Sequence, residues 1–175
     1  KVESTHQSEG PNITRFHDRV TELLGFGYDE NGKTNGIAAY GRPIESLKDY
    51  FFSRQSRDAQ GFPMYSFQRH GRTPLEPERI RLDSYSKEKI LFPAPGLLQM
   101  GQDLREFSPY DIAASAEAHF SDEVNRLIFR HLDSSGHRRV GEEQNVAFSG
   151  GAFNNVSLNG QIAENGHFKS HFSMA

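Results

Sequence analysis

The stretch that decides the fold is residues 145–155, Asn-Val-Ala-Phe-Ser-Gly-Gly-Ala-Phe-Asn-Asn. The apolar residues before Ser149 predict a short buried strand, and the residues after Gly151 predict the first turn of a helix, with a Gly-Gly break between them. Glycines at such a junction let backbone N–H groups approach a ligand closely, and the positive end of the helix dipole faces the same point. The junction therefore fits an anion or phosphate site. The alternative interpretation is a structural turn without a ligand, which is the commoner role of a Gly-Gly pair after a strand.

The residues on both sides of this junction extend the pattern. A helix near 153–164 and an apolar alternation at 167–174 follow the strand, which predicts a βαβ unit with parallel strands. Upstream, Ser108 and Pro109 provide a helix start, and we expect a helix from 109 to about 132. Its predicted core face consists of Ile112, Ala116, Phe120, Val124, Leu127 and Ile128. The chain is thus predicted to be α/β.

The first half of the chain predicts two further helices. Apolar residues at helical spacing predict one helix over 13–24, which Gly25 ends, and another over 44–52. Residues 28–36 are rich in Asn and Gly and predict a polar loop. Residues 53–90 suggest a strand or two around Phe62–Phe67, and 91–107 are predicted to be loop.

Composition limits the classes of function. The 175 residues carry a net charge of −3 and include no cysteine, which excludes disulfides and thiolate metal sites. The balanced charge argues against a nucleic-acid partner. No apolar run reaches the roughly 18 residues of a membrane span. We expect a cytoplasmic protein without nucleic-acid or membrane partners.

Several polar residues are candidates for chemistry. His167 and His171 have a metal-like spacing, but on the predicted strand they lie about 13 Å apart, too far to share one metal ion. Asp29–Gly32 lacks the later ligands of a calcium loop, so that interpretation is rejected. Lys33, in a loop after a helix, suits either a phosphate contact or a solvated turn. No metal ligand is assigned within the chain.

Three sequence blocks resemble the O-carbamoyltransferase family, which includes nodulation-protein-U-type enzymes and carbamoyltransferases of antibiotic pathways. Residues 16–41 resemble the family's Tyr-x-x-Val-Thr-x-x-Leu-Gly-Phe followed by Asp-Glu-Gly-Lys-x-Met-Gly-Leu-Ala-x-Tyr-Gly. Residues 111–117 resemble its Asp-Ile-Ala-Ala-Ser-x-Gln helix. Residues 149–160 resemble its Gly-Gly-Val-Ala-Leu-Asn-x-x-x-Asn-Gly. The blocks occur in the family's order, which favours a ligand site over a plain turn at the Gly-Gly junction.

The resemblance implies a fragment of an actin-like, ribonuclease-H-type fold that binds ATP between two lobes. Residues 1–52 would belong to the first lobe, 53–107 to a variable insertion, and 108–175 to the second lobe. The implied activity is formation of carbamoyl-adenylate from carbamoyl phosphate and ATP, with transfer of the carbamoyl group to a hydroxyl of a sugar or natural product. A homodimer is a possible assembly. The implied nucleotide contacts are Gly25, Glu30, Lys33, Gly150, Gly151 and Asn155.

The sequence departs from the family pattern at several positions. Phe16 replaces Tyr, Asn35 replaces Met, and Asn154 replaces an apolar residue. The family's divalent metal, iron or magnesium, would be bound by an upstream His-x-x-x-His and a downstream Asp, both outside residues 1–175, so this piece alone is expected to be inactive. The alternatives are a threonylcarbamoyl transferase, a kinase-like ATP-binding protein, or a truncated domain without catalysis.

Overall fold

The computed structural model describes most of the helices and two short sheets. Its description covers residues 13–27, 30–57, 63–65, 100, 101, 103–134, 144–164 and 168–174. The chain divides into two compact units, 8–120 and 121–175 with 1–7, and the division falls within a long helix. The predicted domain boundaries at 52 and 107 remain predictions.

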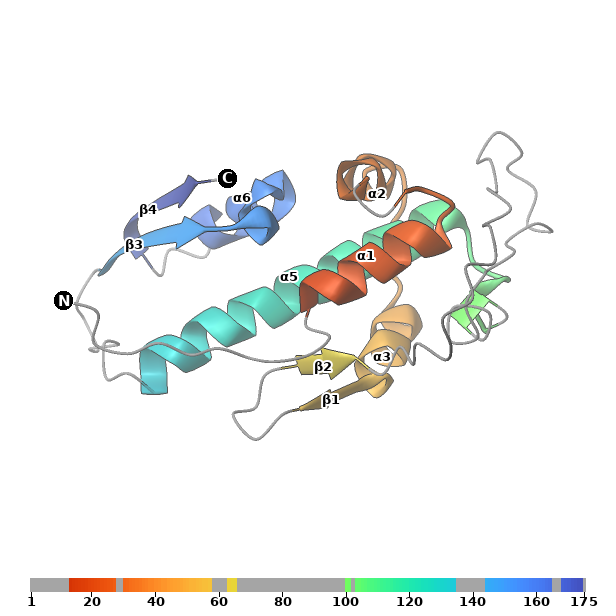
Figure 1. The fold of residues 1–175 in the computed structure, drawn as a ribbon, viewed down its shortest axis with the longest axis horizontal. Helices are drawn as coiled ribbons and strands as arrows, with labels where there is room; N and C mark the ends of the chain where they lie inside the picture. Colours follow the sequence, from red (N-terminus) through yellow and green to blue (C-terminus); the bar gives the residue numbers. More distant parts are fainter. Residues whose placement is uncertain are drawn as a thin grey trace. The chain divides into compact units, whose positions relative to one another are not determined.

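The 8–120 unit is mainly helical (Figure 1). It contains α1 (Ile13–Leu23), α2 (Asn31–Ala38), α3 (Glu45–Ser53), the strands β1 (Gln55–Arg57) and β2 (Pro63–Tyr65), and the start of α5 (Pro109–Ser134). β1 and β2 pair antiparallel. The predicted helices 13–24, 44–52 and 109–132 are confirmed, and β2 confirms a strand in the Phe62–Phe67 segment. The rest of 66–99 lies outside the described residues.

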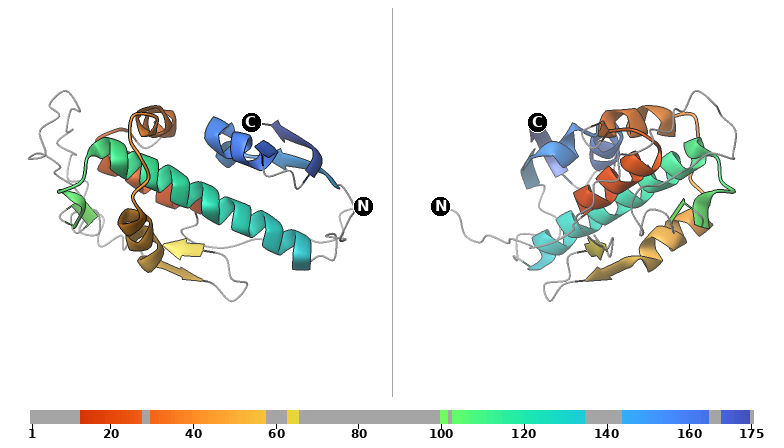
Figure 2. Two further views of the ribbon diagram at one scale, coloured as in Figure 1. Left: turned by 180° about the vertical axis from the view of Figure 1, so that it is seen from behind. Right: turned by 45° about the vertical axis from the view of Figure 1, so that its right-hand side comes forward.

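Aromatic residues form the centre of this unit, where α1 lies alongside α5 (Figures 1 and 2). The Phe16 ring meets Phe51 of α3 edge-on at 5.1 Å between centroids, and it meets His119 of α5 at 5.0 Å. All three side chains are buried. Edge-to-face pairs of this kind add to the free energy gained from burying apolar surface. The Phe16–Phe51–His119 cluster therefore fixes α1, α3 and α5 to one another.

The 121–175 unit contains the predicted βαβ unit. β3 (Gln144–Ser149) and β4 (Phe168–Met174) pair parallel, with Val146 opposite His171 and Ser149 opposite Met174. The connection consists of η1 (Gly151–Asn154), a 3₁₀ turn, and α6 (Val156–Glu164). Phe148 packs on Phe153 at 4.7 Å and on Phe168 at 6.0 Å between ring centroids. The expectation of parallel strands is confirmed.

Three local predictions are wrong. Residues 31–36, part of the predicted loop 28–36, belong to α2 (Asn31–Ala38); residues 100, 101, 103 and 104, also predicted as loop, are helical. The helix predicted from 153 begins at Val156, because the four residues after Gly150 form the tighter 3₁₀ turn. In α2, hydrogen bonds to side chains of α1 outweigh the turn-like composition, and α6 begins where the Asn155 side chain caps it.

Among the residues that the structure describes, no helix combines the length and apolar character needed to cross a bilayer.

Candidate functional site

Gly25 and Glu30 lie between α1 and α2, and Lys33 lies in the first turn of α2. Gly25 ends α1 with φ +84°, a conformation that favours glycine. Its N–H donates to Glu22 O at 3.0 Å, and Phe26 N–H donates to Thr21 O at 3.1 Å. These two bonds form a Schellman motif, which satisfies the last carbonyl groups of the helix. The backbone at Gly25 and Phe26 is thus held by hydrogen bonds to the last turn of α1.

Glu30 and Lys33 face each other at the start of α2. Glu30 Oε2 accepts a hydrogen bond from Gly27 N–H at 2.7 Å, while Oε1 pairs with Lys33 Nζ at 2.5 Å. The Lys33 ammonium also lies 5.7 Å from the centre of the Phe26 ring. The side chains of Lys33 and Glu30 are 55% and 40% exposed. A pair this exposed contributes about 0–1 kcal/mol to stability, and both side chains are open to solvent.

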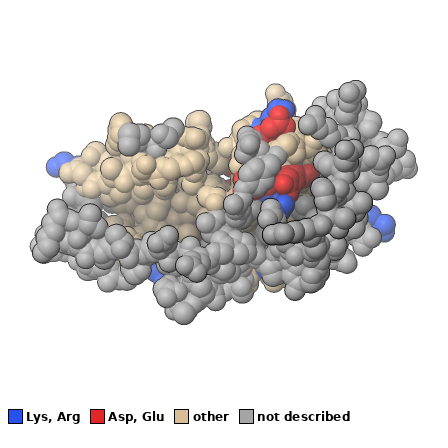
Figure 3. Space-filling view, in the orientation of Figure 1, with Lys and Arg blue, Asp and Glu red and all other residues tan. Residues whose placement is uncertain are grey.

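Charged groups of both signs gather over α1 and α2 on the face that Figure 3 presents. The ion pairs in these elements are Glu30–Lys33 and Arg19–Glu22. Opposite charges side by side cancel much of each other's long-range field. On the described part of this face the charges are therefore of mixed sign, and they do not form a patch of one sign.

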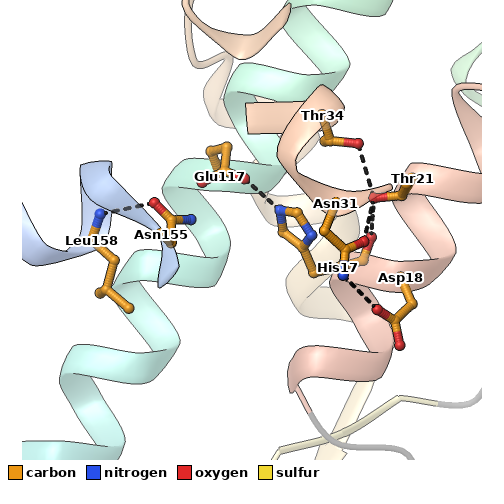
Figure 4. A network of polar contacts seen from close by, with 8 residues as sticks. All are labelled: His17, Asp18, Thr21, Asn31, Thr34, Glu117, Asn155 and Leu158. Carbon is orange, nitrogen blue, oxygen red and sulfur yellow. Dashed lines mark hydrogen bonds and ion pairs between the residues drawn. The ribbon is translucent and has the colours of Figure 1, made fainter. Parts of the chain in front are cut away.

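A buried polar network lies between α1, α2 and α5, and the sequence analysis missed it (Figure 4). His17 Nε2 is hydrogen-bonded to Glu117 Oε1, and these residues are only 4% and 7% exposed. The Asn35 amide nitrogen donates to Glu117 Oε1 at 2.5 Å and to the Asn31 carbonyl at 3.0 Å, in the amide orientation that satisfies both of its polar atoms. A buried carboxylate needs such donors, because desolvation otherwise makes its charge very costly.

The same network continues along α1. The Thr21 hydroxyl lies 2.8 Å from Asn31 Oδ1 and 2.9 Å from the Thr34 hydroxyl, and both threonines are fully buried. Asn31 Nδ2 donates to Asp18 Oδ1 at 2.8 Å. One sequence signal pointed to this network. His17 and Glu117 adjoin the apolar residues Phe16 and Ala116 of amphipathic helices, where charged residues need partners.

The second predicted cluster, in the 121–175 unit, surrounds the Gly-Gly junction. Gly150 has φ +115° and ψ 164°, which an L-residue with a side chain rarely adopts. A Cβ added at Gly151 would meet no atom within 4 Å. The space above Gly151 is open, and so a ligand could approach its backbone closely.

Asn155 has a structural role that the prediction did not include. Its side-chain Oδ1 accepts a hydrogen bond from Leu158 N–H at 3.0 Å, and the residue is buried. Asn155 is therefore the N-cap of α6. The neighbouring Asn159 donates from Nδ2 to Phe153 O at 2.8 Å and accepts from Ser173 Oγ at 3.0 Å, which ties α6 to η1 and β4.

Metal ligation was considered for the histidines. Within the described ranges, no group of three or more His, Cys, Asp or Glu side chains could hold a metal ion. His171 lies on β4, and His167 lies outside the described residues. The described residues therefore offer no donor set for the divalent metal that the family resemblance implies.

Comparison with known proteins adds no assignment: no family model matches the chain, and no curated protein matches it significantly.

Proposed function

We propose that the chain is part of an ATP-dependent O-carbamoyltransferase with an actin-like fold, which makes carbamoyl-adenylate from carbamoyl phosphate and ATP and transfers the carbamoyl group to a hydroxyl of a sugar or natural product. One observation carries this proposal. The family-like segments 16–26, 30–41 and 111–117, far apart in sequence, interlock through their own side chains in the 8–120 unit.

The contacts between these segments are specific. His17 of the first segment and Asn35 of the second both bind Glu117 of the third. At the other end of the second segment, Arg42 N–H donates to Asp111 Oδ1 at 3.0 Å, next to Gly41. These contacts place the three segments in one structural unit, as the resemblance expects of them. Their mutual contacts therefore support the resemblance as a property of the fold.

We propose the nucleotide contacts for each cluster by itself, as the resemblance of residues 16–41 and 149–160 implies them. The backbone of Gly150 and Gly151 would hold phosphates, because the space above Gly151 is open. Glu30 would accept hydrogen bonds from ribose hydroxyls, with Gly25 beside it in the chain, and Lys33 would supply positive charge. Asn155 would act mainly through the helix that it caps. When bound, ATP would supply the adenylyl group of carbamoyl-adenylate, with pyrophosphate as the leaving group.

Isothermal titration of ATP against the 175-residue chain tests the proposal. Gly151→Val fills the open space above the backbone, and Gly160→Val is the matched control, because Gly160 also has nothing within 4 Å of an added Cβ. We expect the wild-type and Gly160→Val chains to bind alike and Gly151→Val to bind about tenfold or more weakly. Equal binding by all three would reject the phosphate site, and no binding by the wild-type chain would reject the nucleotide function.

A further inference from the structure

The short helix α2 has a sequence that does not favour a helix. Its eight residues, Asn-Gly-Lys-Thr-Asn-Gly-Ile-Ala, include two glycines and two asparagines, all less favourable in helices than alanine. Isolated helices below about 12–15 residues are marginal in water even with good sequences. The residue before the helix, Glu30, makes no side-chain capping bond to it, and Thr34 is its one buried residue. Apolar burial and propensity therefore do not explain why α2 is helical.

Hydrogen bonds from side chains of α2 to α1 stabilise the helix, which its own helix propensity and apolar burial do not. Asn31, in the first turn, binds Asp18 and Thr21 of α1. Thr34, one turn later, binds the same Thr21 hydroxyl. The Thr21 hydroxyl has one hydrogen, which is within reach of both Asn31 Oδ1 at 2.8 Å and the His17 carbonyl oxygen at 3.0 Å, and its oxygen can accept from Thr34. The α1-facing side of α2 is thus held by polar groups that water cannot readily replace, since Thr21 and Thr34 are fully buried.

Asn35 extends this attachment to α5. Its amide nitrogen donates to Glu117 Oε1, the same oxygen that His17 Nε2 contacts. In the tautomer whose Nε2 carries hydrogen, His17 also donates to this oxygen, so the carboxylate accepts one bond from α1 and one from α2. Glu117 is therefore the point at which three helices are joined. Removing either donor would leave a buried carboxylate under-satisfied.

We infer that Glu117 and Asn35 act as positioning residues, which hold α2 helical and thereby place Glu30 and Lys33 for the nucleotide. This inference rests on the proposed function for its nucleotide part. Lys33 and Asn35 lie within one turn of Asn31, so loosening of the buried contacts frees the turn that carries the Glu30–Lys33 pair. Glu117 and Asn35 influence the ligand through α2 and do not contact it.

Asn35→Ala gives the sharpest test, because the inference and helix propensity predict opposite results. Alanine is the better helix former, so propensity alone would slow hydrogen exchange of the α2 amides. If the bond to Glu117 holds the helix, their exchange becomes about tenfold faster or more. Glu117→Gln keeps an acceptor oxygen and should exchange like wild type, whereas Glu117→Leu should resemble Asn35→Ala. Glu123→Leu is the matched control, since it removes another buried carboxylate from α5 whose ion-pair partner is Arg126.

The experiment combines hydrogen exchange of the α2 amides, with α3 amides as an internal reference, and ATP titration of the same chains. We expect Asn35→Ala and Glu117→Leu to exchange faster in α2 alone and to bind ATP about tenfold more weakly, with Glu117→Gln and Glu123→Leu unchanged. Unchanged or slower α2 exchange in Asn35→Ala would overturn the inference that this bond holds the helix. Faster exchange with unchanged ATP affinity would overturn the positioning role. A wild-type chain that binds no ATP would reject the proposed function and its nucleotide part, while the exchange data would still decide what holds α2.

Discussion

The backbone of Gly41 approaches the main-chain carbonyl of Tyr110 so closely that a Cβ added to Gly41 would lie 2.0 Å from that oxygen. Two flanking hydrogen bonds keep the segments together: Arg42 N–H donates to Asp111 Oδ1 at 3.0 Å, and Ile44 N–H donates to Ser115 Oγ at 2.9 Å. Glycine is therefore required at position 41 for a close approach between the α2–α3 connection and the first turn of α5.

Gly41→Ala is expected to destabilise the chain by about 1–3 kcal/mol, because the carbonyl of a helix backbone cannot move aside cheaply. Urea unfolding followed by circular dichroism measures the change. Gly36→Ala is the control, since Gly36 lies in α2 with open space around it and alanine should leave stability unchanged or raise it. Equal effects of the two substitutions would contradict the close approach.

The two glycines of the Gly-Gly junction should differ in their tolerance of alanine. Gly150 has φ +115°, so Gly150→Ala is expected to cost about 1–3 kcal/mol of stability through backbone strain. Gly151 has no such backbone conformation and has free space around it, so Gly151→Ala should be nearly neutral. Thermal unfolding of both variants checks the difference, and a neutral Gly150→Ala would show that the junction adapts without strain.

Substitution of Asn155 should preserve stability only if the new side chain can also cap the N-terminus of α6. Asn155→Ala removes the acceptor for Leu158 N–H and is expected to cost about 1 kcal/mol, whereas Asn155→Asp keeps an oxygen there and should preserve stability. Urea unfolding of the two variants distinguishes the cap from a general effect of substitution at a buried site. Equal losses in both would argue against the capping role.

We expect Tyr50 to make the free energy of unfolding depend on pH in the alkaline range. Its hydroxyl donates to Asp103 Oδ2 at 2.7 Å, and burial, then this bond, hold the pKa of the Tyr50 phenol above its ordinary value of 10.0. Above that value the unfolded chain loses the proton and the folded chain keeps it, so the free energy of unfolding falls as pH rises. Below it both states are protonated and the contribution is constant.

Tyr50→Phe removes this titration. Its stability should fall less than that of the wild-type chain between about pH 9 and about pH 11, as measured by urea unfolding at both values. At neutral pH the variant should be less stable by about 1 kcal/mol, because the bond to Asp103 is lost. Parallel losses of stability in the two chains would show that Tyr50 does not carry this alkaline sensitivity.

Elements that are stabilised mainly by local backbone preferences or by burial of their apolar residues could be predicted from the sequence. α1, α3 and α5 follow the spacing of their apolar residues, and the β3–α6–β4 order follows from the strand, glycine break and helix pattern. α2 could not be predicted, because its residues are typical of turns and its partners, Asp18, Thr21 and Glu117, lie on other helices. Tertiary hydrogen bonds here override local propensity.

The candidate site was predictable only in part, for the same reason. Glu30 and Lys33 could be proposed from the family resemblance of residues 30–41, and in the structure their side chains form an ion pair. Gly150 and Gly151 could be proposed from the break after a strand. The His17–Glu117 contact could not be predicted, because no pattern in a single sequence indicates which buried residue of one helix contacts which residue of another.

The same contact has a consequence for biosynthesis. His17 and Glu117 are 100 positions apart, and chains are made from the N-terminus onward. α1 and α2 therefore leave the ribosome long before the carboxylate that joins them exists. Contacts at such separation form late and slowly, because a long segment must first be closed into a loop. The 8–120 unit thus completes its fold only after α5 has emerged, and a nascent chain that stalls before Glu117 leaves the polar side of α2 without its anchor.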